Sequence, residues 1–212
     1  ALLLAVQPDI GQTLLVFFSW SILIFTSGIS IFFLLILFLL LIFVFSYLVF
    51  FVPKFEYIKN RLLSFFNSET GTHNFQSDKA IDSITSGGFF GKGIGEGTLK
   101  NRVPEAHTDY IISVISEEFG VIAIILILVL FLIFIYSVFK KVYFENEEKI
   151  KLILVGCISL ILMQAMIHIG VNIRLFPTTG MTLPFISYGG SSIISISILS
   201  GIILNLTKRK IN

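Results

Sequence analysis

The sequence has little charge and almost no cysteine. Only 13% of its 212 residues are Asp, Glu, Lys or Arg, whereas soluble domains carry roughly 25%. A single Cys excludes a disulfide scaffold and a Cys-based zinc site. A net charge of +2 gives no reason to expect a nucleic-acid partner. Because 55% of the residues are hydrophobic, a disordered chain, a coiled coil and an ordinary soluble enzyme are excluded as well.

Long uncharged runs take the place of charge. A helix needs about 20 apolar residues to cross a bilayer core, and four runs contain no charged residue: 10–53, 119–139, 152–173 and 175–207. The first is long enough for two helices, with a break near Thr26-Ser27-Gly28. Pro177, Gly180 and Pro184 restrict the helix of the last run to about 185–206. The pattern predicts an all-α polytopic membrane protein with five transmembrane helices.

Lysine and arginine in short loops predict the orientation of these helices. The loop at 140–151 carries four lysines, and the tail carries Lys208, Arg209 and Lys210, so both are predicted to be cytoplasmic. The predicted organisation follows: two transmembrane helices within 1–53, one large extracytoplasmic loop at 54–108, and three transmembrane helices within 109–212. Residues 1–6 look like the end of a further span, and we expect the chain to be the C-terminal part of a larger membrane protein.

An acidic residue near the start of the third span is a functional candidate, because charge is costly in a bilayer. A helix that starts at Pro104 would align Asp109, Ser113, Ser116 and Gly120 on one face. Such a polar stripe faces protein or a water-filled cavity. Alternatively, Asp109 only caps the helix and the small residues pack helices together. Spacing alone leaves both interpretations open.

Gln164, His168 and Asn172 recur at every fourth position and form a second polar stripe. Hydrogen bonding between helices is the favoured interpretation, because no further His or Cys completes the spacing of a metal site. We therefore predict no metal ligand among them.

Two segments of the sequence predict irregular backbone. The glycine-rich run 87–97 lacks the Gly-Lys-Ser/Thr ending of a P-loop, so we expect a flexible surface loop against the membrane, and anion binding by its amides stays open. A short amphipathic helix with Ala80, Ile81 and Ile84 on one face is expected before it. The run 177–192 has two prolines and two glycine turns, a pattern tolerated at membrane depth only inside protein or along a cavity.

Four blocks of sequence together resemble the SEDS family of bacterial cell-wall proteins, which includes FtsW, RodA and SpoVE. They occur in the family's order and cover the whole chain. The residues of these blocks are more similar to those of the division branch, FtsW, than to those of RodA. The blocks are Gln-Pro-Asp-Ile-Gly at 7–11, the run 87–97, Pro-Glu-Ala-His-Thr-Asp-Tyr-Ile at 104–111 followed by Glu-Glu-Phe-Gly at 117–120, and the run 177–192.

The resemblance implies a fold of ten spans, of which this chain matches the last five. It implies a peptidoglycan glycosyltransferase in the bacterial cytoplasmic (inner) membrane that polymerises lipid II during cell division. The implied partners are lipid II, membrane lipid, a class B penicillin-binding transpeptidase and other divisome proteins. Asp109 matches the family's essential acid, and a carboxylate there can act as general base on the acceptor sugar hydroxyl. No cofactor is evident, and a divalent cation, Mg²⁺ or Mn²⁺, stays open.

The same match implies a set of substrate-binding residues. Lys92, Lys100 and Arg102 are cations available to the pyrophosphate of the substrate. The other matched positions are Glu105, His107, Thr108, Pro177, Thr178, Gly180, Ser187, Gly189, Gly190 and Asp9.

Two other functions stay open beside the enzyme. One is a lipid II flippase, for which the polar row at Gln164 and His168 would line a translocation path. The other is a scaffold that recruits the transpeptidase. A carboxylate at the outer surface favours the enzyme, because polymerisation takes place there after export of the substrate.

Overall fold

The computed structural model describes residues 9–66 and 72–208, and its regular elements in these ranges are all helices. The predicted end of an earlier span at 1–6 lies outside the described residues. In chain order the elements are α2 (Ile10–Thr26), α3 (Ile31–Phe51), the 3₁₀ helix η1 (Pro53–Phe55), α4 (Glu56–Phe66), α5 (Thr72–Gly87), the 3₁₀ helix η2 (Leu99–Arg102), α6 (Ile111–Phe144), α7 (Glu148–Asn172) and α8 (Gly190–Thr207).

The apolar runs form the expected membrane helices. Among the described residues, α3, α6, α7 and α8 are long and apolar enough to cross a membrane, and α2 is a shorter apolar helix. The predicted break is confirmed: α2 ends at Thr26, and Gly28 has a φ of 88°, which glycine adopts without a steric penalty. The protein is therefore a polytopic helical membrane protein. The last helix begins at Gly190 rather than near 185, because Phe185 has a left-handed φ of 67° that cannot continue a right-handed helix.

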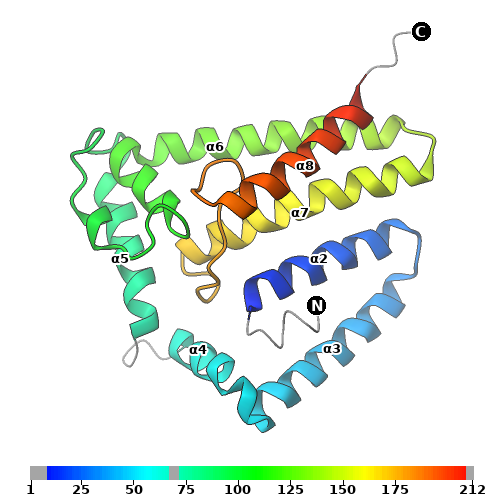
Figure 1. The fold of residues 1–212 in the computed structure, drawn as a ribbon, viewed down its shortest axis with the longest axis horizontal. Coiled ribbons are helices and arrows are strands. Elements are labelled where there is room, and N and C mark those ends of the chain that lie inside the picture. Colours follow the sequence, from blue (N-terminus) through cyan, green and yellow to red (C-terminus); the bar gives the residue numbers. More distant parts are fainter. Residues whose placement is uncertain (1–8, 67–71, 209–212) are drawn as a thin grey trace.

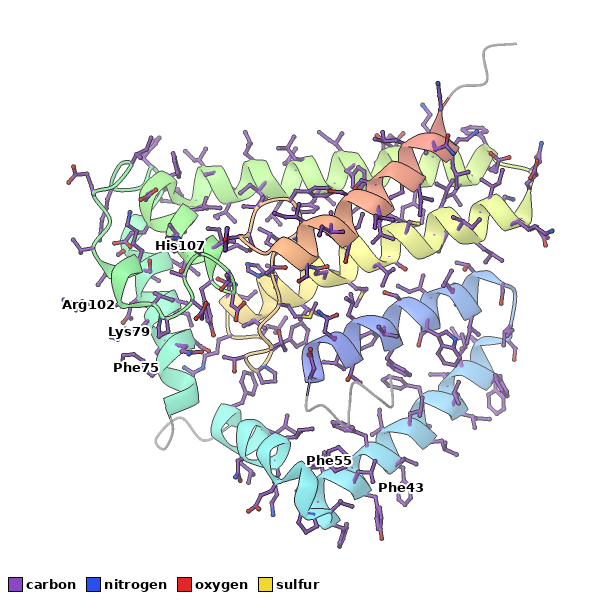
Figure 2. The ribbon with its side chains drawn as sticks, in the orientation of Figure 1. Phe43, Phe55, Phe75, Lys79, Arg102 and His107 are labelled. Atoms are coloured by element: carbon purple, nitrogen blue, oxygen red, sulfur yellow. The ribbon has the colours of Figure 1, made fainter. Side chains whose placement is uncertain are left out.

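Helix α7 is the centre of the bundle. It contacts α2, α6 and α8, and these helices run alongside it in Figure 1. Half of its most apolar stretch is buried, whereas none of the corresponding stretch of α3 is. Helix α3 diverges from α2 (Figure 1), and its Phe43, which is 73% exposed, points away from the rest of the chain (Figure 2). A helix that is apolar on all sides suits a membrane span.

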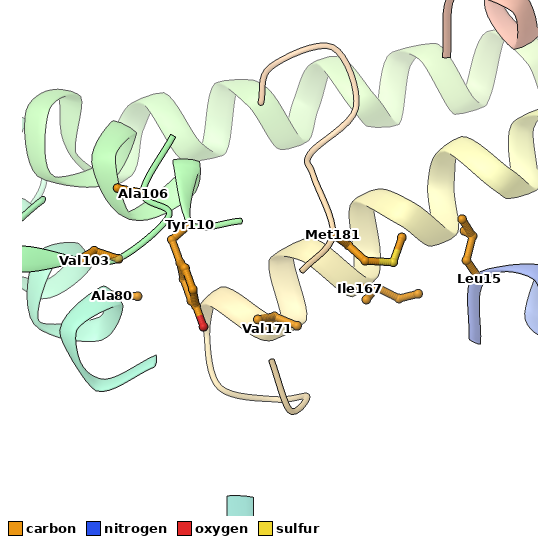
Figure 3. Close-up of a cluster of buried hydrophobic side chains, with 8 residues drawn as sticks. All are labelled: Leu15, Ala80, Val103, Ala106, Tyr110, Ile167, Val171 and Met181. Carbon is orange, nitrogen blue, oxygen red and sulfur yellow. The ribbon is translucent and has the colours of Figure 1, made fainter. Parts of the chain in front are cut away.

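One buried apolar cluster connects the segment before α6 to the bundle. Tyr110 lies between α5 and α7, with Val171 of α7 on one side of it (Figure 3). Its other side faces Ala80 of α5 and the irregular residues Val103 and Ala106. Apolar burial therefore fixes the segment before α6, which has no continuous series of helical hydrogen bonds to hold it. The remaining members of the cluster are Leu15, Ile167 and Met181.

Helix α6 is interrupted at Gly120, whose φ of 75° and ψ of −176° are not helical. The interruption frees the carbonyl oxygens of Glu117 and Glu118 from the helical ladder. They accept hydrogen bonds from the backbone N–H groups of Lys92 (2.9 Å) and Gly93 (3.0 Å) in the glycine-rich run. The run thus satisfies backbone groups that would otherwise be left without partners.

The helix resumes after Gly120, and its first N–H groups again bond to the glycine-rich run. The N–H groups of Val121 and Ile122 donate to the carbonyl oxygens of Gly88 (3.0 Å) and Phe89 (3.3 Å). A Cβ atom on Gly120 would lie 2.2 Å from the Phe89 oxygen, so only glycine fits. The run 88–93 lies at the surface, as expected, with Phe89 and Phe90 exposed. Its backbone is held by hydrogen bonds to α6.

Candidate functional site

Asp109 lies in a series of turns before α6 and not on a helix. Helix α6 begins at Ile111, its N-cap is Tyr110, and no side chain caps it. The predicted helix start at Pro104 and the alternative capping role of Asp109 are both wrong. The reason lies in Glu105, whose φ of 54° is left-handed and cannot continue a right-handed helix.

The turn before Asp109 is tied to α7 and to the segment before α8. The carbonyl oxygens of residues 107, 108 and 109 accept three hydrogen bonds in succession. Their donors are the Tyr188 backbone N–H (3.1 Å), the Ser187 hydroxyl (2.7 Å) and the Asn172 side-chain amide (3.0 Å). Residues far apart in sequence therefore determine where the Asp109 side chain stands.

The second polar stripe fixes the irregular segment against α7. Gln164 Nε2 donates to the carbonyl oxygen of Thr182 (2.9 Å). His168 Nδ1 donates to the carbonyl oxygen of Met181 (2.7 Å), since a carbonyl oxygen can only accept. Asn172 is the third member of the stripe. The favoured interpretation, hydrogen bonding between helices, is confirmed only for Gln164, whose Nε2 also donates to Ser192 Oγ of α8 (3.1 Å). His168 and Asn172 bond instead to the irregular segments that carry Met181 and Asp109.

Beyond Asp109, the first predicted stripe faces protein rather than a cavity. Ser113 and Ser116 are both buried. Ser116 Oγ donates to the carbonyl oxygen of Ile84 (3.2 Å) on α5. A Cβ atom on Gly87 would lie 1.9 Å from the backbone oxygen of Ser116. The small residues therefore let α5 and α6 approach closely, as the packing alternative predicts.

The Asp109 side chain faces a cavity of about 120 Å³. A Cβ atom on Gly180, where φ is 70°, would lie 3.6 Å from Asp109 Oδ2. Thr179 also lines this cavity, and its hydroxyl is buried without a hydrogen-bond partner among the described residues. A ligand in the cavity would therefore meet the Asp109 carboxyl. The lining residues are Gln76, Asp109, Tyr110, Val171, Thr178, Thr179, Gly180 and Met181.

The surroundings of Asp109 act on the pKa of its carboxyl in both directions, and the net shift is upward. Burial raises the pKa of the carboxyl above its ordinary value, and the negative charge of Glu105 raises it further, while a hydrogen bond from the Thr108 side chain lowers it. The ion pairs of the described residues do not include Asp109. A half-buried carboxyl with a raised pKa is suited to accept a proton from a bound group.

The structure brings only some of the predicted substrate-binding residues together. Thr178 and Gly180 line the same cavity as Asp109. Pro177 adjoins them and is half-buried. Thr108 and Ser187 belong to the hydrogen-bonded framework behind the carboxylate.

The predicted cations lie outside this cavity. Lys92 Nζ is 3.3 Å from Glu117 Oε1, and Lys100 forms an ion pair with Glu118. The side chain of Arg102 is exposed and lies at the periphery of the molecule (Figure 2). A role for these cations in binding pyrophosphate stays a prediction.

The remaining predicted residues are spread around the site. The side chains of Glu105 and His107 are exposed. Gly189 is the N-cap of α8, and Gly190 is its first residue. Asp9 caps α2 by accepting a hydrogen bond from the Gln12 N–H (2.9 Å).

Sequence reasoning missed Gln76, Thr179 and Tyr110 as members of the site. Gln76 carries no motif, and only the packing of α5 brings it to the cavity. Thr179 and Tyr110 adjoin predicted site residues in the sequence, so proximity to Thr178 and Asp109 was the available signal. Among the residues that do not line the cavity, Arg174 Nη1 is 2.7 Å from Asp78 Oδ1, which connects the residues after α7 to α5.

The comparisons with known proteins agree on one family. The chain matches the "Cell cycle protein" family of FtsW, RodA and SpoVE over residues 1–212. The probable peptidoglycan glycosyltransferase FtsW of Caulobacter vibrioides is 34% identical over 209 residues, which are 98% of this chain and 52% of that protein. Stage V sporulation protein E of Bacillus subtilis is 34% identical over 210 residues, which are 98% of this chain and 57% of that protein.

A solved structure shows the same fold. It comes from a peptidoglycan synthase complex described as coordinating polymerization and crosslinking. It matches with a TM-score of 0.77 and 28% identity, and the match covers 97% of this chain and 56% of that chain.

The apolar helices around α7 and the carboxylate at their irregular junction define a polytopic membrane protein with a cavity beside the bundle. This chain belongs to the FtsW/RodA/SpoVE family, the SEDS family that its sequence blocks resemble. It spans about half the length of the curated relatives it matches.

Proposed function

We propose that the full-length protein is a peptidoglycan glycosyltransferase that polymerises lipid II into glycan strands during bacterial cell division. The observation that carries the proposal is the Asp109 carboxyl, which faces a cavity and belongs to no ion pair among the described residues. The names of relatives, several of them probable peptidoglycan glycosyltransferase FtsW, support it.

The proposed chemistry gives Asp109 the part of general base. Its carboxylate takes the proton from the acceptor sugar hydroxyl, and the hydroxyl oxygen forms a bond to the anomeric carbon of the donor sugar. The bond from that carbon to undecaprenyl pyrophosphate breaks, and the pyrophosphate leaves with the electron pair. Proton transfer by a positioned group contributes about 10²–10⁴-fold to a rate. Thr178, Thr179 and Gln76 offer hydrogen bonds to the sugars in the same cavity.

The decisive assay follows labelled lipid II with the purified full-length protein. Polymerisation is measured by separating the glycan chains on a gel. Translocation is measured in vesicles, by the label that becomes accessible from the lumen. We expect chains without translocation. Translocation without chains would replace the proposal with a flippase, and neither activity together with transpeptidase binding would leave a scaffold. The polar row that suggested a translocation path is engaged in hydrogen bonds, so it no longer favours the flippase.

The proposed location is the bacterial inner membrane, with 54–108 outside and 140–151 inside the cell. The proposed partner is a class B penicillin-binding transpeptidase, consistent with the synthase complex that shares the fold. An impermeant thiol reagent tests the orientation in intact cells at Glu96→Cys and Asn146→Cys, two exposed positions, with the other cysteines replaced. Labelling of the Asn146→Cys variant alone would reverse the orientation.

The proposal assigns no resident metal to this chain. A divalent cation, Mg²⁺ or Mn²⁺, would bind with the pyrophosphate of the substrate. We expect EDTA followed by Mg²⁺ or Mn²⁺ to change the rate of polymerisation without changing the unfolding temperature. A fall in the unfolding temperature on chelation would point instead to a metal held by the protein.

A further inference from the structure

We propose that Glu117 is a positioning residue whose buried carboxylate anchors the segment that leads to Asp109. The anchoring is a property of the fold, and its effect on catalysis rests on the proposed function. Glu117 lies on α6 behind this segment, outside the residues that line the cavity.

The Glu117 carboxylate is surrounded by donors. Its side chain is fully buried, with 0% of its surface exposed. Oε1 accepts hydrogen bonds from the Leu99 N–H (3.0 Å) and the Lys92 ammonium (3.3 Å). Oε2 accepts from the Lys100 N–H (2.6 Å) and the Ser83 hydroxyl (3.0 Å). Such a set of donors matches the acceptor capacity of an ionised carboxylate.

The glycine-rich run is shaped to reach this carboxylate. A Cβ atom on Gly97 would lie 2.8 Å from the Glu117 Cδ atom, so a larger residue would push the segment away. A buried carboxylate is costly unless donors surround it. The carboxylate and the segment at 97–100 are therefore mutually dependent, and neither keeps its place without the other.

The anchor lies at one end of the segment that carries Asp109. From Leu99 and Lys100 the chain passes through η2 to Val103 and Ala106, which are buried against Tyr110. The other end is fixed by the carbonyl hydrogen bonds of residues 107–109. Loss of the first anchor would let the chain before Asp109 shift, and a misplacement of about 1 Å can cost 10²-fold in rate.

The change that tests this anchor is Glu117→Gln, which keeps the shape but turns an NH₂ group toward donors. Asp82→Asn is the matched control: Asp82 also pairs with a lysine, Lys79, at 3.2 Å, but its side chain is 55% exposed. Hydrogen exchange of the full-length protein in lipid nanodiscs should rise in peptides covering 97–109 for Glu117→Gln and stay unchanged for Asp82→Asn. Unchanged exchange in Glu117→Gln would overturn the anchoring, whether or not the protein polymerises lipid II.

Kinetics then test whether the anchor matters for chemistry. Glu117→Gln should lower kcat for polymerisation by about 10–100-fold and change KM by less than about twofold, because the cavity itself is intact. The acid side of its pH–rate profile should stay where it is, since Asp109 still titrates. Loss of the acid limb of the profile would mean that Glu117 itself is the titrating group. A normal kcat together with raised hydrogen exchange would show that the anchor does not position Asp109 for catalysis.

A milder change covers the case in which Glu117→Gln does not fold. Ser83→Ala removes one of the hydrogen bonds to Oε2 and leaves the charge paired with Lys92. It should raise exchange at 97–109 and lower kcat in the same direction, by a smaller factor. No change in either measurement would contradict the proposal. If the wild-type protein makes no glycan chains, the proposed function fails, and the exchange arm still decides the anchoring.

Discussion

Asp109 and Glu117 are two acids close in sequence that lie in opposite surroundings. Glu117 is fully buried, and backbone, hydroxyl and ammonium donors occupy its carboxylate. Asp109 is half-buried and faces a cavity, and the ion pairs of the described residues do not include it. The carboxylate with its donors in place supports the fold, whereas the one that lacks a cation is free to act on a ligand.

The comparison also separates two groups of predicted site residues. Lys92 and Lys100, which the sequence offers as pyrophosphate ligands, pair with Glu117 and Glu118. Thr178 and Gly180 lie instead with Asp109. The two lysines thus pair with the structural acids, and apart from Asp109 the cavity is lined by uncharged residues.

The largest effect is expected from Asp109→Asn, which keeps the shape of the side chain and removes the base. Polymerisation by the full-length protein should fall by about 10²–10⁴-fold, with expression, unfolding temperature and transpeptidase binding unchanged. Chain formation at a near-normal rate would remove Asp109 from the mechanism. Loss of folding or of partner binding would instead place Asp109 with Glu117, among the residues that support the fold.

The next effect is on stability and comes from Gly120→Ala. The φ and ψ of Gly120 are almost exclusive to glycine, which costs other residues of order 1–3 kcal/mol, and the clash with the Phe89 oxygen adds to this. We expect a lower unfolding temperature in detergent, together with reduced activity. Gly201→Ala in α8 is the control, because its Cβ would meet nothing within 4 Å. Equal unfolding temperatures for the two variants would contradict the role of the helix break.

A smaller effect concerns the pH dependence. The charge of Glu105 helps to raise the pKa of Asp109, and a general base must be ionised to act. Activity should therefore fall as the pH drops through this raised pKa, at a higher pH than for an ordinary aspartate. Glu105→Gln lowers the pKa of Asp109 and should shift the acid limb of the pH–rate profile to lower pH. Glu96→Gln, at another exposed acid of the loop, should leave the limb in place, and a shift in the opposite direction would exclude the assigned charge effect.

The smallest effect is expected from Asp78→Asn, at a residue that does not line the cavity. Its ion pair with Arg174 is short, but the two side chains are 47% and 27% exposed. Exposed pairs contribute roughly 0.2–1 kcal/mol, so stability should change by less than about 1 kcal/mol and kcat should stay within about twofold. Thermal unfolding and the polymerisation assay measure both. A loss as large as that of Asp109→Asn would show that charge at Asp78 takes part in the site.

The sequence predicted the membrane helices because their signal is local. Uncharged runs long enough for a bilayer and the glycine at position 28 marked the spans and their first break. The start of α6 escaped prediction, because Pro104 favours a helix start while the left-handed Glu105 prevents the helix from continuing. Pro104 thus favoured a helix locally, but the chain forms turns there instead. Hydrogen bonds from Asn172 and Ser187, which lie far along the chain, hold these turns.

The sequence by itself determined the class of protein, the irregular segments and the candidate acid at position 109, since composition and motif order carry them. Only the tertiary structure decided what surrounds each acid. The donors to Glu117 come from α5, the glycine-rich run and η2, and the cavity of Asp109 is closed by residues of α5, α7 and the segment before α8. Hydrogen bonding and burial act between neighbours in space, so the difference between a structural and a reactive carboxylate exists only in the folded chain.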